Sequence, residues 1–199
     1  LVTYDMLVVQ GGLSSGEWLL ITGVSSGVGV SSAQLGRFLG AKVIGTSGSA
    51  AKLAKLDLDV AIETRKPGFA KRAIEATGGK GVNLAVNTVG GSLFPDCLAS
   101  LAYQGRLAIV GYVDGKTTSE VDLDAVHAKR LRIFGVSNKM RTAPEREGMV
   151  KGFAKDVLPA FGDGRIVPMI DRVFPMADLQ AAVDYMNSDA QLGKIVVVN

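Results

Sequence analysis

The chain has 199 residues, of which 47% are hydrophobic and 21% charged, and its formal net charge is +3. This length fits one sizeable domain with part of a second, and the composition excludes a disordered or fibrous protein. The basic residues are not interleaved with aromatic ones, which argues against a nucleic-acid-binding surface. A single cysteine, Cys97, excludes an internal disulfide framework, and no apolar run reaches the ~20 residues that span a bilayer. We therefore expect a cytoplasmic protein.

Short apolar runs rich in β-branched residues alternate with helical patterns along the first two thirds of the chain. Most of the runs are apolar throughout rather than alternating, as is typical of strands that are buried on both faces. Strands that alternate with helices form a doubly wound parallel sheet through right-handed crossovers. The sequence thus predicts an α/β, Rossmann-type sheet of about six strands, at 18–22, 41–46, 59–62, 82–87, 106–111 and 131–136.

A long helix is expected at about 143–161. Thr142 supplies its N-cap, Pro144 lies in the first turn and Glu145 occupies the capping-box position. A strand interrupted by Pro168, a short amphipathic helix and a terminal strand follow, so we expect a Rossmann domain over 1–165 and a strand–helix–strand segment over 166–199. The chain does not begin with methionine, which suggests a piece of a longer polypeptide.

The stretch "LLITGVSSGVGVSSAQLG" (19–36) carries the strongest functional signal. A strand ends at Thr22, three glycines follow at Gly23, Gly27 and Gly29, and a helix then begins. Glycines let the backbone approach phosphates, and the free N–H groups and dipole of a helix start favour negative charge. The sequence predicts a dinucleotide pyrophosphate site here, whereas the alternative is a glycine-rich turn that packs a helix on a strand.

The second strand indicates which dinucleotide would bind. NAD-binding proteins normally place Asp or Glu at its end to hold the ribose hydroxyls. Here the strand ends "GTSGSAAK", which offers Ser49 and Lys52 but no carboxylate. We therefore predict NADPH as the cofactor, with Lys52 at the 2′-phosphate; the alternative for Lys52 is an exposed lysine in a first helical turn.

Two families share this glycine pattern. "TGVSSGVG" matches the short-chain dehydrogenase fingerprint, but that family also needs a Tyr-x-x-x-Lys pair on a helix. Tyr112 and Lys116 have the spacing, yet Asp114-Gly115 between them predicts a turn, so we disfavour this family. The chain instead resembles the medium-chain dehydrogenase/reductase superfamily, in its zinc-independent quinone oxidoreductase and enoyl (alkenal) reductase branch. The resemblance rests on the stretch leading into 19–36, on "GVNLAVNTVGGSLFPDCLASLAYQGRLAIVGYVDG" and on "LGKIVVVN".

The resemblance implies a set of cofactor-binding positions. Those expected at the pyrophosphate, ribose and 2′-phosphate are Ser26, Gly27, Val28, Gly29, Ser49, Lys52, Thr64 and Thr88. Those expected near the nicotinamide or reaching the cofactor from the C-terminal segment are Gly111, Tyr112, Phe134, Gly135, Val136 and Gln191. A tyrosine is common in the family at position 64, and Arg65 could replace its phosphate contact. The segment 52–60 is shorter than the family's, which means either a truncated helix or missing residues.

The resemblance also implies a function. We expect the NADPH-binding domain of an oxidoreductase that transfers hydride to a quinone, enone or enoyl substrate, with a catalytic domain lying upstream of residue 1. The alternatives are a non-catalytic nucleotide-binding or structural domain, and an enoyl-reductase module of a multidomain synthase. We assign no catalytic residue and no metal site within the chain; the only histidine, His127, is expected at the surface. A homodimer through edge strand 131–136 is expected, with neither nucleic acid nor membrane as a partner.

Overall fold

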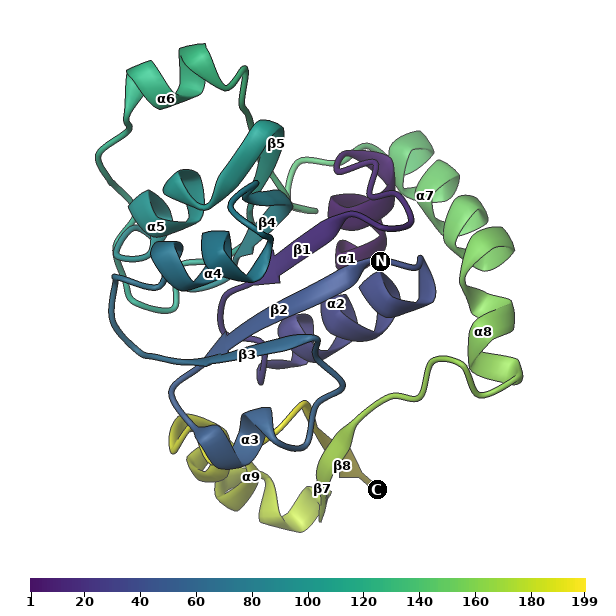
Figure 1. Ribbon diagram of the computed structural model, residues 1–199. Coiled ribbons are helices and arrows are strands. Elements are labelled where there is room, and N and C mark those ends of the chain that lie inside the picture. Colours follow the sequence, from purple (N-terminus) through teal and green to yellow (C-terminus); the bar gives the residue numbers. More distant parts are fainter.

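A computed structural model describes residues 1–199, and its centre is one parallel sheet of six strands (Figure 1). The strand order is β3-β2-β1-β4-β5-β6, so that β1 lies between β2 and β4. This order confirms the doubly wound α/β fold that the alternating pattern predicts. The strands are β1 (Trp18–Ile21), β2 (Lys42–Ser47), β3 (Val60–Glu63), β4 (Val82–Asn87), β5 (Leu101–Ile109) and β6 (Arg132–Gly135).

Helices cover both faces of the sheet because successive residues of its central strands point to opposite sides. In β1, Leu19 and Ile21 belong to one buried cluster and Leu20 to the other, and all three are fully buried. The first cluster packs under α1 (Val2–Tyr4), η1 (Asp5–Val9), α2 (Gly27–Phe38), α7 (Ala143–Asp156) and α8 (Leu158–Gly162). The second packs under α4 (Ala70–Ala76) and α5 (Phe94–Ala99).

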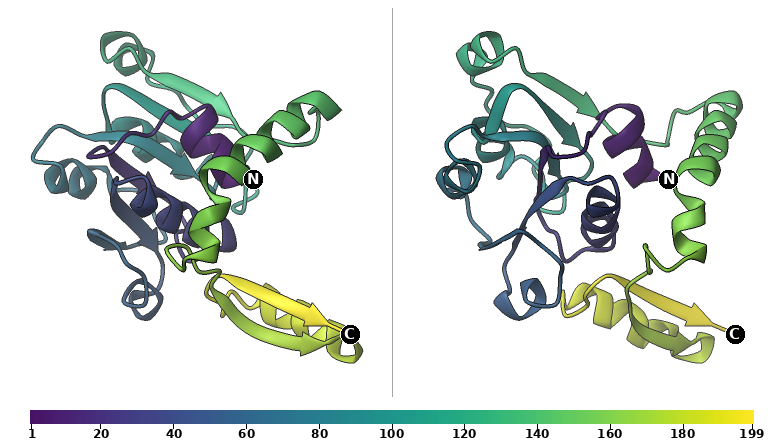
Figure 2. Two further views of the ribbon diagram at one scale, coloured as in Figure 1. Left: turned by 90° about the vertical axis from the view of Figure 1, so that its right-hand side faces the viewer. Right: turned by 45° about the vertical axis from the view of Figure 1, so that its right-hand side comes forward.

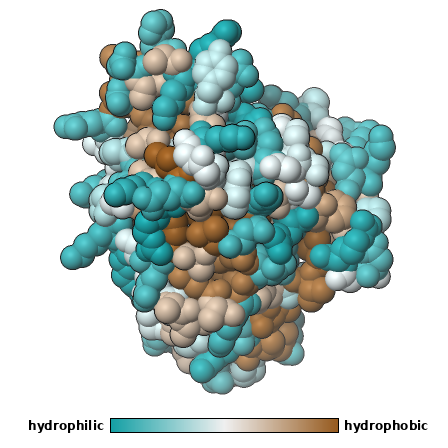
Figure 3. Space-filling view, viewed as in Figure 1, coloured by the Kyte–Doolittle hydropathy of each residue, from teal (hydrophilic) through white to brown (hydrophobic).

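The C-terminal segment forms a separate small unit. Strands β7 (Ile170–Pro175) and β8 (Lys194–Val198) pair in parallel, and η2 (Met176–Asp178) and α9 (Leu179–Asn187) connect them. Figure 2 shows this unit extending away from the main sheet. Its exposed apolar side chains include Ile170, Val173, Met176, Leu179 and Val198. Figure 3 shows hydrophobic residues at the surface in this part of the molecule.

Several element boundaries differ from the expected ones. Strand β5 begins at Leu101, five residues earlier than predicted, because "LAYQG" pairs with β4 across a register shift and turns at Gln104, whose φ is +59°. The long helix after Thr142 is divided at Val157, since Pro159 cannot donate the next helical hydrogen bond. Its predicted capping box between Thr142 and Glu145 is confirmed. Helix α6 (Leu123–Ala128), capped by Asp122, was not predicted.

The N-terminal residues form a helical turn that packs against α7 and the end of β6. The Tyr4 hydroxyl donates to the Asp156 carboxylate at 2.6 Å, and this hydrogen bond, with burial, raises the pKa of Tyr4 to about 12. Asp5 is 1% exposed and pairs with Arg141 at 2.5 Å. This ion pair between residues far apart in sequence thus joins the N-terminal helical turn to the segment between β6 and α7.

No helix of the structure is both long enough and apolar enough to cross a membrane. Cys97 is buried in the second cluster, as its position among apolar residues predicts, and burial raises the pKa of its thiol. His127 is exposed in the last turn of α6. Neither side chain is therefore placed for chemistry in a cleft.

Candidate cofactor site

The start of α2 follows β1, where the strand order reverses. From β1 the chain continues to β2 and β3 on one side, and β4 lies on the other side. In doubly wound sheets this is the position of the ligand crevice. Ser26 has an extended backbone conformation and is the N-cap, and its hydroxyl accepts a hydrogen bond from the Gly29 N–H at 3.0 Å. The N–H groups of Gly27 and Val28 have no earlier turn of helix to bond to. An anion seated at this helix start would therefore find two free donors.

Two glycines of the motif are required by close packing. A Cβ atom on Gly29 would overlap the Gly23 carbonyl oxygen and lie 2.6 Å from the Val24 backbone, which no side chain tolerates. Gly23 has φ +61°, a conformation that favours glycine. The alternative interpretation of the motif, tight helix-on-strand packing, therefore explains Gly29 and Gly23. It does not explain the cleft in front of them.

A cleft of about 430 Å³ opens beside the start of α2. Six of the predicted cofactor residues line it: Ser26, Ser49, Lys52, Thr64, Thr88 and Gln191. Thr88 is buried, and its hydroxyl donates to the Thr22 carbonyl oxygen at 2.7 Å, so its side chain also ties β4 to β1. The Gln191 Oε1 atom is buried without a hydrogen-bond partner. Gln191 lines the cleft, but this oxygen is itself buried, and an unpaired buried acceptor requires an explanation.

The other predicted positions lie outside the lining of this cleft. Gly27, Val28 and Gly29 form the first turn of α2. Gly111 and Tyr112 follow β5, and Tyr112 lines a neighbouring cavity of about 210 Å³. The range 134–136 lies at the carboxyl end of β6, with Val136 buried and Phe134 half-buried. All of these positions belong to the carboxyl edge of one parallel sheet, which is the edge that ligands use in this kind of fold.

Two cations lie at the end of the cleft formed by β2 and β3. Ser49 caps the four-residue helix α3 (Ala50–Leu53), which carries Lys52. The Arg65 side chain lies directly on Gly48, since a Cβ there would be 2.6 Å from Arg65 Cδ. The short α3 agrees with the truncated helix that was one of two explanations for the short segment 52–60. Lys52 and Arg65 together make this end of the cleft suitable for a phosphate group.

A carboxylate that the sequence did not indicate also reaches this region. Glu63, the last residue of β3, is in register with Ser47 of β2, and its Oε1 accepts from the Ala50 N–H at 3.3 Å. Glu63 does not line the cleft, whereas Lys52 and Arg65 do. Neither β2 nor β3 therefore contributes a carboxylate to the residues that line the cleft.

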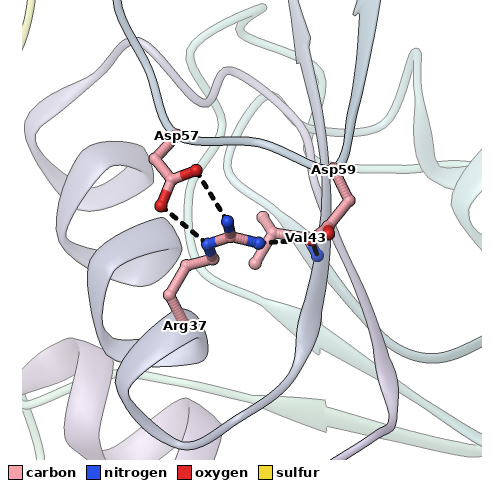
Figure 4. A network of polar contacts seen from close by, with 4 residues as sticks. All are labelled: Arg37, Val43, Asp57 and Asp59. Atoms are coloured by element: carbon pink, nitrogen blue, oxygen red, sulfur yellow. Dashed lines mark hydrogen bonds and ion pairs between the residues drawn. The ribbon is translucent and has the colours of Figure 1, made fainter.

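The connection from α3 to β3 is held by a network of ion pairs and hydrogen bonds (Figure 4). The Arg37 guanidinium of α2 donates to both oxygens of Asp57, at 2.6 and 2.8 Å, and to Asp59 at 2.7 Å. The same Asp59 oxygen accepts from the Val43 N–H. These hydrogen bonds, led by the one to Asp57, raise the pKa of Arg37. The network fixes the connection from α3 to β3 against α2 and β2. It therefore helps to position α3, the helix that carries Lys52.

The C-terminal unit supplies one side of the cleft, which the sequence indicated only through Gln191. Gly193 donates to the Ser25 carbonyl oxygen at 3.0 Å and forms a bridge with Ser26. The Lys194 side chain crosses Gly27, because a Cβ on Gly27 would lie 2.6 Å from Lys194 Cε and 2.9 Å from Nζ. A cation at a helix start is unfavourable until an anion neutralises it. Lys194 does not line the cleft, but its side chain lies at the helix start where an anion would bind.

The loop after β5 closes the opposite side of the cleft. Asp114 accepts hydrogen bonds from the Ser92 N–H at 2.8 Å and the Lys116 N–H at 2.9 Å. Burial raises the pKa of Asp114, but these hydrogen bonds outweigh it, and the pKa lies below its usual value. Asp114 and Gly115 form a turn, so Tyr112 and Lys116 do not share a helical face. The structure therefore confirms the reason for disfavouring the short-chain dehydrogenase family.

Comparison with known families decides the relationship. A family model described as zinc-binding dehydrogenase matches residues 27–153, which is more than half of the chain. The chain belongs to the zinc-binding dehydrogenase family. This family is part of the medium-chain dehydrogenase/reductase superfamily, so the resemblance inferred from the sequence is confirmed.

Three similar proteins are informative. Acryloyl-coenzyme A reductase of Sulfurisphaera tokodaii is 32% identical over 190 residues, which are 94% of this chain and 52% of that protein. Polyketide synthase 37 of Dictyostelium discoideum is 26% identical over 99% of this chain and 7% of its own length. The structure of mycobacterial Rv1454c complexed with NADPH has a TM-score of 0.82 and 28% identity, over 100% of this chain and 62% of that one. The chain thus spans about half the length of the reductase it matches.

The family's name raises the question of zinc. Among residues 1–199 of this zinc-binding dehydrogenase chain, no three side chains of His, Cys, Asp and Glu come together in a way that could hold a metal ion. The residues present do not fit a zinc site, and we derive no step through a metal.

Proposed function

We propose that the protein is an NADPH-dependent reductase that transfers hydride to a conjugated substrate: an enoyl thioester, an enone or a quinone. One observation carries the proposal. The capped start of α2, with free N–H groups at Gly27 and Val28, lies beside the same cleft that Lys52 and Arg65 line. Donors for a diphosphate and cations for a further phosphate, both at the crevice of a doubly wound sheet, are what NADPH requires.

Different residues of the chain would bind different parts of the cofactor. The start of α2 and Lys194 would hold the diphosphate, Ser49 and Lys52 the phosphorylated ribose, and Gln191 a donor group of the cofactor. Both cations in the lining come from the β2–β3 end, where an NAD-specific protein would offer a carboxylate to the ribose. This supports NADPH over NADH. The NADPH complex of mycobacterial Rv1454c is consistent with the same choice.

The nicotinamide end would lie at Tyr112 and the range 134–136. When bound, NADPH supplies the hydride from its nicotinamide ring. The chain's part is to orient that ring, to exclude water with half-buried Phe134 and buried Val136, and to leave one ring face open to substrate. We assign no proton donor within residues 1–199. We propose that residues beyond this chain complete the substrate site, in keeping with the half-length coverage of the reductase relative.

A second candidate function is that of an enoyl-reductase module in a multidomain synthase. It is favoured by the match to polyketide synthase 37 across 99% of the chain. The two candidates share the cofactor and the class of reaction, and they differ in whether the substrate arrives free or attached to a carrier. A cytoplasmic location belongs to the proposal and rests on the lone unpaired cysteine.

Cofactor binding and turnover test the proposed function directly. We expect calorimetry to give a micromolar dissociation constant for NADPH and at least a tenfold weaker one for NADH. In the longest protein that the gene encodes, NADPH should be oxidised with at least one of an enoyl-coenzyme A thioester, a simple enone and a quinone. The 199-residue chain should bind NADPH with little turnover. Absence of heat with either nucleotide would overturn the proposal, and binding without oxidation of NADPH by the longest protein would favour the non-catalytic alternative.

We also propose that the protein is a homodimer through β6. This strand is at the edge of the sheet, and its Ile133 is 40% exposed. Exposed apolar edges are usually covered by another strand. Light scattering at micromolar concentration should give twice the 20.8 kDa of one chain. Ile133→Lys, which places a charge on the edge, should give one chain mass with an unchanged circular dichroism spectrum; a wild-type mass of one chain would contradict the dimer.

A further inference from the structure

Asp189, in the segment after α9, contacts both cations of the cleft, Lys52 and Arg65. The Lys52 ammonium donates to the Asp189 carbonyl oxygen, and Arg65 Nη1 lies 3.9 Å from Asp189 Oδ2. All three residues line the cleft and belong to different elements of the fold. In Figures 1 and 2 the C-terminal unit accordingly lies beside α3. One residue, Asp189, therefore contacts both cations: Lys52 through its backbone carbonyl oxygen and Arg65 through its carboxylate.

We propose that Asp189 is a specificity-determining residue: its carboxylate competes with the 2′-phosphate of NADPH for Arg65, and so limits the preference for NADPH over NADH. The inference rests on the proposed function. Asp189 was not predicted as a site residue, since nothing in "NSDAQLGK" distinguishes it from any exposed acid after a helix.

The charges of the cleft support this competition. Its lining contains two cations, Lys52 and Arg65, and two carboxylates, Asp114 and Asp189. Asp114 has its own partners in the N–H groups of Ser92 and Lys116, whereas the Asp189 carboxylate faces Arg65. A phosphate between the two cations would therefore lie next to a second anion. Removing that anion should favour NADPH, which carries the 2′-phosphate, and should affect NADH, which has only the diphosphate, much less.

Asp189 can be neutralised without disturbing the backbone. Its φ is +54°, in the left-handed region, which asparagine also adopts readily. The residue is exposed, and an asparagine at this position would keep the same backbone carbonyl oxygen for Lys52. Asp189→Asn therefore changes the charge and little else. Asp163→Asn is the matched control, because Asp163 is an exposed acid paired with Arg165 and neither residue lines the cleft.

Calorimetric titration with NADPH and with NADH tests the inference. We expect Asp189→Asn to tighten NADPH binding about three- to tenfold, with NADH changed less than twofold and a smaller gain at high salt. Asp163→Asn should match the wild type with both nucleotides. An Asp189→Asn protein with wild-type affinities, or with equal gains for NADPH and NADH, would overturn the inference.

A second variant separates this inference from the proposed function. Lys52→Met should weaken NADPH binding at least tenfold and leave NADH within about twofold. If Lys52→Met behaves so and Asp189→Asn has no effect, the role of Asp189 is wrong and the NADPH site stands. If the wild type binds neither nucleotide, the proposed function fails and the inference fails with it.

Discussion

Replacing Arg141 by methionine is expected to lower the free energy of unfolding by about 3–5 kcal/mol, because a buried carboxylate would lose its counter-ion. Asp5 is 1% exposed, and its Oδ2 accepts from Arg141 and, at 2.9 Å, from the Gln10 amide. Its Oδ1 already lacks a partner. Methionine can fill the volume of the arginine stem, so the loss of the charge dominates. Urea unfolding followed by circular dichroism measures the effect.

Two further variants identify the cause. Asp5→Asn in the Arg141→Met background should recover part of the lost stability, since no charge then remains buried. Lys151→Met removes an exposed pair with Glu147 and should change stability by about 0.5 kcal/mol or less. A loss below about 1 kcal/mol for Arg141→Met would show that Asp5 reaches water when its partner is gone.

Replacing Gly29 by alanine is expected to destabilise the protein by about 2 kcal/mol and to weaken NADPH binding at least tenfold. The new methyl group would overlap the Gly23 carbonyl oxygen, and backbone atoms cannot rotate away as a side chain can. The start of α2 would have to move, taking the N–H groups of Gly27 and Val28 with it. Urea unfolding and NADPH titration of the same preparation measure both effects.

Gly148→Ala is the matched control for this substitution. Gly148 lies in α7, is exposed, and would place its Cβ in open space. Alanine there should stabilise the protein by about 0.5–1 kcal/mol through helix propensity alone and leave NADPH binding unchanged. Equal stability changes in the two variants would mean that the contact at Gly29 relaxes without cost.

The order of elements in the main sheet could be predicted because each strand signals itself locally. The run "VNLAVN" (82–87), for example, follows a glycine and is mostly apolar, and it forms a buried strand at the expected residues. The start of β5 and the N-terminal helical turn could not be predicted in this way. "LAYQG" reads as the end of a helix until β4 is available to pair with it, and Asp5 is explained only by Arg141, which lies far along the chain.

The residues of the candidate site also fall into those that local sequence predicts and those that depend on tertiary contacts. Ser26, Ser49 and Lys52 lie two to five residues after the ends of β1 and β2, so their place at the carboxyl edge of the sheet was predictable, and they line the cleft. Glu63, Asp189 and Lys194 were missed. Glu63 reaches the turn after β2 through sheet register, and the other two through the placement of the C-terminal unit on α2. Such tertiary placement leaves no trace in local spacing.

The hydrogen bond from Gly193 to Ser25 links two parts of the chain that fold as separate sheets. A diphosphate held by α2 and Lys194 would touch both parts at once. The Gly193 amide proton exchanges with deuterium when this hydrogen bond opens, so its protection reports the free energy of that opening. The exchange of this one amide proton therefore measures the stability of the junction at which we propose that the diphosphate binds.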